Sequence, residues 1–319
     1  MRAFITGATG FVGGHLAAKL IARGDEVVAL VRSPDKAGEL SRLGATIVQG
    51  DLNNVDVMTE AMSGCDACFH VAAGYKVGVF EDGCRAMHES NVTGTENVLK
   101  AATDAEVARV VYVSTIGYYG NTRGTVVDET FTRTDKDWLT CYDETKYKAH
   151  EVAERYISDG APVLIAQPGG IYGPGDTSDL SLLIDRVKKG WIKLSLMPGV
   201  GFNFVHVDDV VEGLLLVHDK GRVGESYNLG GEIATLGELI AKVATLAGRK
   251  PPKRELPLGV IKRSVGPWKY LAPLMGFPPN LRELVRASDG VTYWATDAKA
   301  RSELGYSPRP LDVGLPDIA

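Results

Sequence analysis

The sequence has few cysteines, no excess of positive charge and no long apolar run. Its four cysteines are too few for a scaffold built on disulfides, and Cys65 and Cys68 lack the second pair that a zinc site of this spacing needs. With 35 basic and 40 acidic residues, the net charge of −5 argues against nucleic-acid binding. No apolar stretch approaches the roughly 20 residues of a membrane span. We therefore expect no metal site, no nucleic-acid partner and no membrane anchor.

The remaining composition is that of an ordinary globular protein, with 45% hydrophobic and 24% charged residues. A first strand is expected from residue 2, which leaves no room for a signal peptide. The sparse cysteines suit a reducing compartment, so we expect a cytoplasmic location.

Short β-rich runs alternate with longer amphipathic stretches over the first 170 residues. Strands are expected over 3–6, 26–31, 46–49, 67–72, 110–114 and 163–167. Helices are expected over 11–23, 34–43, 55–62, 82–102 and 142–158. Strands separated by helices are typical of right-handed crossovers, and the continuous apolar strands indicate helices on both faces of a parallel sheet. The expected fold class is therefore α/β, with a doubly wound Rossmann sheet.

A glycine-rich turn follows the first expected strand and leads directly into the first expected helix. Gly7 allows a sharp turn, Gly10 lets the backbone approach a diphosphate, and Gly13 lets the helix pack on the strand. The helix N-terminus then offers free N–H groups to the anion. The residues expected to contact a dinucleotide here are Gly7, Thr9, Gly10, Phe11, Val12 and Gly13. The alternative is a tight turn that binds nothing.

The end of the second strand indicates which dinucleotide is bound. Proteins that bind NAD usually carry an acidic residue there, whereas this chain has Arg32. A guanidinium suits a 2′-phosphate, and Ser33 and Lys36 stand close enough in sequence to assist. We therefore expect NADP(H) as the preferred cofactor, with NAD(H) still possible.

Tyr142 and Lys146 stand four residues apart, on one face of an expected helix. They follow the fifth strand, which ends at Ser114 and Thr115 at the sheet edge where doubly wound folds bind ligands. A nearby ammonium lowers the pKa of a phenol, so Tyr142 could exchange a proton with a carbinol oxygen. Tyr142 and Lys146 are also expected to contact the cofactor, with Lys146 orienting its ribose. Thr115, or Ser114 beside it, would hydrogen-bond that oxygen, and a nicotinamide would exchange the hydride. The alternative is a surface pair without a catalytic role.

These motifs together resemble those of the extended short-chain dehydrogenases/reductases, in the NAD-dependent epimerase/dehydratase superfamily. The matching segments are 6–13, 50–52, 70–73, 91–95, 114–115, 142–146, 168–174 and 204–209. The segment 224–231 is similar to dihydroflavonol 4-reductase-like and hopanoid-associated epimerase-like members.

The resemblance implies further cofactor contacts. These are Asp51 and Leu52 at the adenine, Val71, Ala72 and Ala73 at the nicotinamide ribose, Asn91 at a helix kink with a water near Lys146, and Pro168, Gly169 and Ile171 beside the nicotinamide. It also favours Thr115 over Ser114 as the catalytic hydroxyl. Ile116 and Gly117 stand where sugar-nucleotide dehydratases carry an Asp-Glu pair, which removes the usual acid and base for eliminating water.

Beyond residue 175, proline and glycine become frequent, and clear helical patterns remain over 208–218 and 235–246. We expect 1–174 to form a dinucleotide-binding Rossmann domain and 175–319 a smaller substrate-binding lid region, parts of which return to the Rossmann core. The residues expected to shape the substrate pocket are Tyr75, Tyr118, Tyr119 and Asn203.

The expected activity is hydride transfer between NADP(H) and a carbonyl or alcohol carbon of a small organic substrate, with Tyr142 as acid or base. Two alternatives stay open: a nucleotide-sugar epimerase that retains its NAD(P), and a binding protein that senses NADP without turnover. The resemblance also suggests a homodimer through the helices at 82–102 and 142–158.

Overall fold

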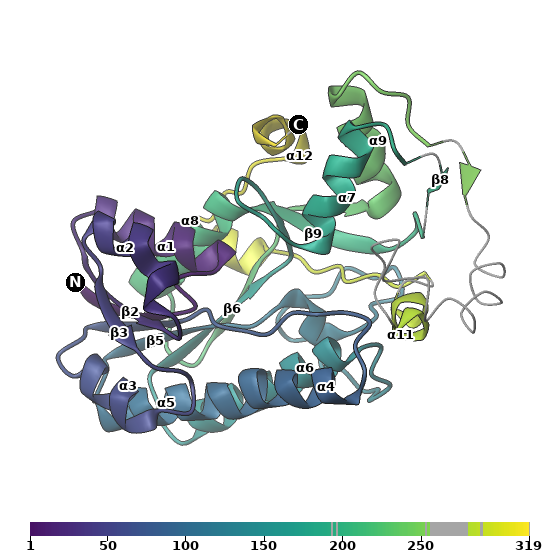
Figure 1. The fold of residues 1–319 in the computed structure, drawn as a ribbon. Helices are drawn as coiled ribbons and strands as arrows, with labels where there is room; N and C mark the ends of the chain where they lie inside the picture. The colour runs from purple at the N-terminus through teal and green to yellow at the C-terminus, as the bar shows by residue number, and fades with distance from the viewer. Residues whose placement is uncertain (193, 196, 253, 256–279, 288–289, 319) are drawn as a thin grey trace.

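A parallel sheet of seven strands forms the centre of the molecule. The computed structural model describes residues 1–192, 194–195, 197–252, 254–255, 280–287 and 290–318 (Figure 1). The strands are β1 (Arg2–Thr6), β2 (Glu26–Val31), β3 (Thr46–Gln49), β4 (Ala67–His70), β5 (Arg109–Val113), β6 (Val163–Pro168) and β10 (Ser226–Leu229). Their order is β10-β6-β5-β4-β1-β2-β3, and every neighbouring pair is parallel. The structure thus confirms the expected Rossmann fold.

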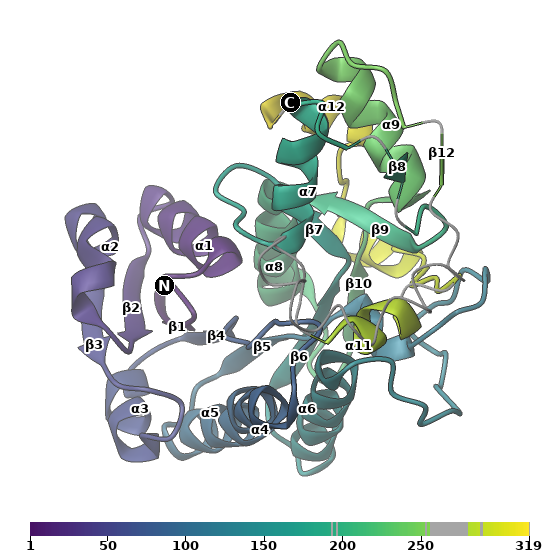
Figure 2. The same cartoon turned by 45° about the vertical axis from the view of Figure 1, so that its right-hand side comes forward.

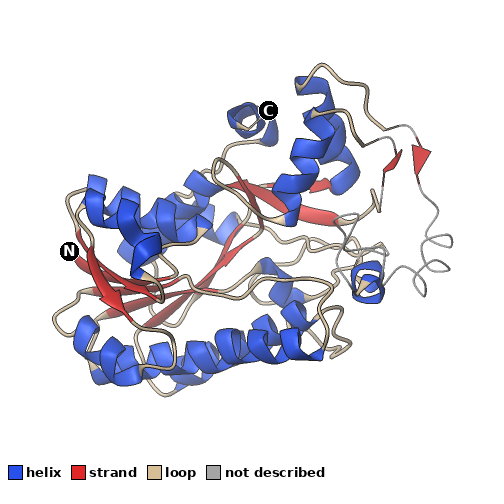
Figure 3. Cartoon of the chain, viewed as in Figure 1, coloured by secondary structure: helices blue, strands red, loops and turns tan. Residues whose placement is uncertain are grey.

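Helices cover both faces of this sheet (Figures 1 and 3). One layer contains α1 (Phe11–Ala22), α2 (Gly38–Leu43) and α8 (Val207–Lys220). The other contains α3 (Val55–Met62), α4 (Glu81–His88), α5 (Gly94–Asp104) and α6 (Cys141–Ser158). Alternate strand residues enter two separate cores: Ile5 and Ala29 pack with the first layer, and Phe4 and Val28 with the second. Burial on both faces explains why the strands read as continuous apolar runs.

The expected helix over 82–102 is divided into two. A π-helical turn, η2 (Glu89–Thr93), separates α4 from α5 and contains Asn91. The expected helix over 34–43 is likewise a 3₁₀ turn, η1 (Pro34–Ala37), followed by α2. Both differences are local changes of helical pitch, which apolar periodicity alone does not reveal.

The residues after β6 form a smaller lobe beside the main sheet and also supply the last strand of that sheet, β10 (Figure 2). Its elements are β7 (Gly170–Tyr172), α7 (Asp179–Lys188), β8 (Leu194–Ser195), β9 (Gly201–His206), β11 (Glu232–Thr235), α9 (Leu236–Leu246), β12 (Arg254–Glu255), α11 (Leu281–Arg286) and α12 (Leu311–Gly314). Strands β11, β9 and β7 form a three-stranded sheet. Because β10 and α8 also come from beyond residue 174, the Rossmann core is shared between the two expected regions.

None of the helices in the described segments combines the length and apolar character needed to cross a bilayer.

Candidate active site

The glycine-rich turn between β1 and α1 leaves no room for a side chain at Gly7 or Gly13. Gly7 has a φ of +77°, and a Cβ there would lie 2.8 Å from the backbone nitrogen of Ala72. A Cβ on Gly13 would overlap the carbonyl oxygen of Gly7, and the Gly10 N–H donates to that same oxygen at 2.9 Å. The turn therefore brings the backbone of α1 against the end of β1, as the glycine spacing predicts.

The N-terminus of α1 is open for an anion. Gly10 is the N-cap, with no side-chain cap, and the first turn contains no acidic residue. Thr9 and Gly10 are exposed, while Phe11 and Val12 are half-buried. Unpaired N–H groups and the helix dipole favour a negatively charged ligand here. The residues present thus fit the diphosphate of a dinucleotide.

Arg32 lies just beyond the carboxyl end of β2, next to β1 in the sheet. Arg32, Ser33 and Lys36 are all exposed, and the Lys36 N–H donates to the Ser33 carbonyl at 3.0 Å. Within the described part of the chain, neither cation forms a salt bridge. Two cations and a hydroxyl are therefore available at the position where Rossmann proteins bind the adenosine ribose.

The residues expected around the adenine lie in the turn before α3. The carboxylate of Asp51 accepts the N–H of Asn53 at 2.8 Å. The carbonyl of Leu52 accepts from the amide of Asn97 at 2.8 Å, and the Leu52 side chain packs so closely on Gly94 that a Cβ there would lie 2.6 Å away. The turn is thereby held against α5.

Asn91 holds the segment that follows β4. Its amide accepts the N–H of Gly74 at 2.6 Å and donates to the Gly74 carbonyl at 3.0 Å and to Thr145 Oγ1 at 3.1 Å. The Ala72 N–H donates to Thr6 Oγ1 at 3.3 Å. The π-helical turn thus points Asn91 at both α6 and the 71–74 backbone, where Val71 and Ala72 are half-buried and Ala73 is exposed.

Pro168 and Gly169 lie at the carboxyl end of β6, and Ile171 follows them in β7, paired with Val205 of β9. Pro168 is paired with Leu229 of β10, and the Gly169 N–H donates to the Leu229 carbonyl at 3.4 Å. A Cβ on Gly169 would overlap the carbonyl oxygen of Asn203. The three residues therefore border the same sheet edge as the glycine turn.

Helix α6 presents Tyr142 in its first turn and Lys146 one turn later. Thr140 caps the helix by accepting the N–H of Asp143 at 2.9 Å. Tyr142 is half-buried, whereas Lys146 is buried with 3% of its surface exposed. The Lys146 ammonium donates to the Val113 carbonyl at 2.9 Å and to the Tyr112 hydroxyl at 3.2 Å. Its described partners therefore lie on β5.

Burial sets the protonation of both groups. It lowers the pKa of Lys146 to about 7, because a charged ammonium is poorly solvated inside the protein. Burial also raises the pKa of Tyr142 well above its usual range, while a hydrogen bond with Thr115 acts in the lowering direction. The phenol therefore keeps its proton at neutral pH in this state. The expected lowering of the Tyr142 pKa by the Lys146 ammonium is wrong here, because burial dominates and Lys146 is directed to Tyr112 and Val113.

The hydroxyls of Ser114 and Thr115 have different surroundings. Ser114 Oγ is buried and lies 2.8 Å from Nδ1 of His150. Thr115 is half-buried, accepts the N–H of Gly117 at 3.1 Å and is near enough to Tyr142 to lower the pKa of its phenol against the effect of burial. Thr115 is thus the hydroxyl that lies on the Tyr142 side.

The residues expected to shape the substrate pocket do not gather at one place, although Tyr118 and Tyr119 contact each other edge-on, with ring centroids 5.6 Å apart. Tyr75 is 56% exposed and packs edge-on against Tyr142, with ring centroids 4.7 Å apart. Tyr118 stacks on His150 at 3.7 Å, and the buried hydroxyl of Tyr119 donates to Asn228 Oδ1 at 3.1 Å.

Asn203 is buried, and its amide exchanges two hydrogen bonds with the backbone of Ala295, at 2.7 and 3.0 Å. Tyr75 is thus the member of the set that contacts Tyr142, and the substrate contacts of the other three stay predictions.

Two features around Tyr142 are missed by the sequence patterns. One is the contact between Tyr112 and Lys146. The sequence gives a single indication of it: a tyrosine within an otherwise apolar strand, whose buried hydroxyl needs a hydrogen-bond partner. Arg133 forms a buried, two-pronged ion pair with Asp143, at 2.6 and 3.1 Å. No local spacing predicts that pair, because a loop brings Arg133 to the helix.

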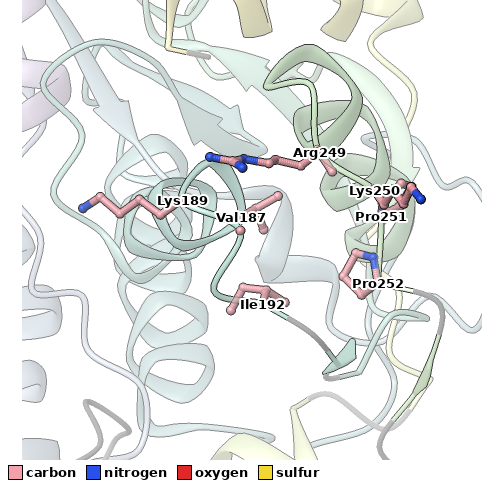
Figure 4. A pocket seen from close by; sticks show the side chains of 9 residues that line it. Val187, Lys189, Ile192, Arg249, Lys250, Pro251 and Pro252 are labelled. Atoms are coloured by element: carbon pink, nitrogen blue, oxygen red, sulfur yellow. The ribbon is translucent and has the colours of Figure 1, made fainter.

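A cavity of about 370 Å³ lies elsewhere, where the C-terminal ends of α7 and α9 meet (Figure 4). It is lined by Val187, Lys189, Gly190, Ile192, Ala244, Arg249, Lys250, Pro251 and Pro252. None of these residues belongs to the sheet edge that carries Tyr142 and the glycine turn. The cavity is therefore separate from the candidate active site.

Comparisons with known proteins agree with this geometry. Residues 3–230 match the NAD dependent epimerase/dehydratase family. A 4-hydroxy-2-methyl-3-oxo-4-farnesyl-3,4-dihydroquinoline-1-oxide ketoreductase of Stigmatella aurantiaca is 32% identical over 97% of this chain and 92% of its own. A 3 beta-hydroxysteroid dehydrogenase/isomerase of Mycobacterium tuberculosis is 30% identical, over 96% and 86%.

A solved structure of a dTDP-glucose 4,6-dehydratase from Streptomyces venezuelae, with NAD bound, is also similar. It is 25% identical, the match covers 100% of this chain and 95% of that one, and the TM-score is 0.80. The family expected from the motifs is thus confirmed. The chain belongs to the NAD-dependent epimerase/dehydratase family of extended short-chain dehydrogenases/reductases, enzymes that transfer a hydride with a nicotinamide cofactor.

Proposed function

We propose that the protein reduces the carbonyl group of a small organic substrate with NADPH, using Tyr142 as the proton donor. The observation that carries the proposal is the placement of Tyr142 between Thr115 and the exposed ring of Tyr75, at the sheet edge that also holds the glycine turn. Two relatives of the chain are named for a ketoreductase and a hydroxysteroid dehydrogenase, both of which act on a carbonyl or carbinol carbon.

The chain's residues divide the work of the reaction. When bound, the nicotinamide supplies the hydride. Thr115 donates a hydrogen bond to the substrate carbonyl oxygen and holds it beside Tyr142. Tyr142 then transfers its phenolic proton to that oxygen, which becomes the hydroxyl of the product. Lys146, when protonated, stabilises the phenolate that remains.

The cofactor is held at both ends in this scheme. Backbone N–H groups of the turn from Gly7 to Gly13 bind the diphosphate, and Arg32 with Lys36 and Ser33 binds the 2′-phosphate of NADPH. Asp51 and Leu52 contact the adenine. The ribose and nicotinamide contacts are those of Val71, Ala72, Ala73, Asn91, Tyr142, Lys146, Pro168, Gly169 and Ile171, with Lys146 orienting the ribose.

The test measures consumption of NADPH and of NADH with a panel of ketones and aldehydes, including sterol ketones and quinoline ketones. We expect turnover with NADPH at a kcat/KM at least tenfold above that with NADH. Tyr142→Phe should bind NADPH with an unchanged Kd and lose at least a hundredfold in kcat, because only the transferable proton is removed. Full activity of this variant would refute the mechanism.

The same experiment separates the two alternatives. An epimerase would leave purification with dinucleotide bound and would consume none that is added. A sensor would bind NADPH tightly and show no turnover across the panel. The resemblance implies an acid at this position in sugar-nucleotide dehydratases, and the buried, apolar Ile116 cannot supply one, which supports a reaction without elimination of water.

We also propose a cytoplasmic homodimer that pairs through the helices at 82–102 and 142–158. Light scattering on the purified protein should give twice the chain mass of 34.2 kDa, and a monomer mass would refute the dimer.

A further inference from the structure

A disulfide joins the residue before Tyr142 to the neighbouring helix. Cys141 is the first residue of α6, and Cys84 lies in α4, with their Cα atoms 5.4 Å apart. The two helices run side by side below the sheet in both Figures 1 and 2. The bond therefore ties the start of the helix that carries Tyr142 and Lys146 to a second element.

The segment between β4 and α4 forms the aromatic mouth of the site. It carries Tyr75, whose ring packs edge-on against Tyr142, and it ends at the exposed Phe80, the N-cap of α4. Because Cys84 lies in the first turn after Phe80, the disulfide anchors this segment to the start of α6. The disulfide thus covalently links the two segments that carry Tyr75 and Tyr142.

Glu283 makes a second, non-covalent bridge at the same place. Its carboxylate accepts the N–H of Cys141 at 2.6 Å with one oxygen and the N–H of Val79 at 3.0 Å with the other. The side chain of Glu283 is buried, and Asn280 donates to the Val79 carbonyl at 2.9 Å. Without the disulfide, hydrogen bonds such as these and those of Asn91 with Gly74 would hold the mouth.

The four cysteines fall into two classes. Cys84 and Cys141 are half-buried at the surface between α4 and α6. Cys65 and Cys68 are buried, and burial raises the pKa of both thiols, which disfavours the reactive thiolate. Exchange with small thiols in solution is therefore confined to one pair.

We propose that Cys84 and Cys141 form a thiol–disulfide exchange site for small thiols and disulfides, whose oxidised form holds the aromatic mouth closed over Tyr142. The sparse cysteines predict a reducing compartment, whereas Cys84 and Cys141 are joined in the structure, and a bond that exchanges with small thiols is compatible with both. The effect on catalysis rests on the proposed function, whereas the exchange chemistry does not.

The chemistry balances with a disulfide such as oxidised glutathione. The thiolate of one cysteine attacks a sulfur of the small disulfide, the S–S bond breaks, and one small thiol leaves. The second cysteine attacks the protein sulfur of this mixed disulfide and releases the second small thiol. Two protein thiols are oxidised, one small disulfide is reduced, and the two protons end on the small thiols.

The first test follows the thiols in the folded, full-length protein. After treatment with oxidised glutathione or with dithiothreitol, free thiols are alkylated and peptides are weighed. We expect only Cys84 and Cys141 to change between the two treatments. If they stay blocked under dithiothreitol, or stay free under oxidised glutathione, the exchange site is refuted.

The second test measures the mouth without any substrate. Amide hydrogen exchange of residues 74–80 should be at least threefold faster in the reduced protein, while β1 and α1 are unchanged. The variant C84A/C141A should match the reduced protein under both treatments. The matched control C65A/C68A should keep the response, because these cysteines lie in the core. If amide hydrogen exchange of residues 74–80 is equally fast in the oxidised and reduced proteins, the disulfide only crosslinks the two helices and the proposal is refuted, even if the Tm differs.

The third test uses the carbonyl compound that turns over in the panel above. Reduction should raise its KM at least threefold with kcat and the Kd for NADPH within twofold, because residues 74–80 of the mouth lie beyond Val71, Ala72 and Ala73, the part of the same segment that is proposed to contact the cofactor. An unchanged KM would refute control of the site. If no compound turns over, the proposed reductase fails, and the exchange measurements still decide on the cysteines.

Discussion

At the scale of single residues, the two hydroxyls that follow β5 are not equivalent. Ser114 Oγ is hydrogen-bonded to Nδ1 of His150, whereas the Thr115 hydroxyl lowers the pKa of the Tyr142 phenol. We expect Thr115→Val to lower kcat/KM at least a hundredfold, because a hydrogen bond to the reacting oxygen is lost. Ser114→Ala should lower it less than threefold. Steady-state kinetics on both variants check this, and the reverse ranking would contradict the assignment.

Lys146 makes the stability of the fold depend on pH. Burial lowers its pKa to about 7 in the folded protein, so the folded state binds fewer protons than the unfolded state between that value and its ordinary pKa. The contribution of Lys146 to stability therefore falls as the pH is lowered from about 10 toward 7, and is level below.

The variant Lys146→Met removes this contribution. Relative to the native protein, its free energy of unfolding should be higher at pH 6 than at pH 10, as measured by urea denaturation in cofactor-free buffer. A difference between the two proteins that does not change with pH would show that Lys146 is not desolvated.

At the scale of elements, the turn between β1 and α1 depends on a close approach of backbone atoms that only glycine allows. A Cβ on Gly13 would overlap the Gly7 carbonyl oxygen, whereas one on Gly14 would meet Ala8 O at an ordinary 3.4 Å. We expect Gly13→Ala to weaken NADPH binding at least a hundredfold and Gly14→Ala to change it less than threefold. Fluorescence titration measures both, and equal affinities would contradict the steric argument.

The elements of the first half could be predicted because their signals are local. The strands over 26–31 and 46–49 and the helix over 55–62 agree with the structure to the residue, since the strands contain short apolar runs and the helix has an amphipathic spacing. The π-helical turn around Asn91 could not be predicted in this way, because it changes only the hydrogen-bond pattern within a continuous apolar stripe.

In the candidate site, too, the residues with a local sequence signal could be predicted and those brought in by loops could not. The glycines and the pair Tyr142 and Lys146 have fixed spacings within one element. Arg133, Glu283 and the Cys84–Cys141 bond reach the site across loops, and long-range pairings leave no periodic trace in a sequence.

At the scale of the whole molecule, the Rossmann core requires residues from both halves of the chain. Strand β10 pairs with β6, and Val210 and Leu214 of α8 pack in the same core as Ile5 and Leu16. We therefore expect residues 1–174 alone to lack a cooperative unfolding transition. Circular dichroism during heating measures this, and a cooperative transition with NADPH binding would contradict it.

The late arrival of β10 has a consequence for synthesis. Strand β6 ends at Pro168, and its outer edge stays unpaired until Leu229 has been made, about 60 residues later. At ribosomal speed this gap lasts about 3 to 12 seconds, during which an apolar strand edge is open to other nascent chains. The growing polypeptide therefore passes through a window in which a ribosome-associated chaperone that shields this edge would raise the yield of native protein.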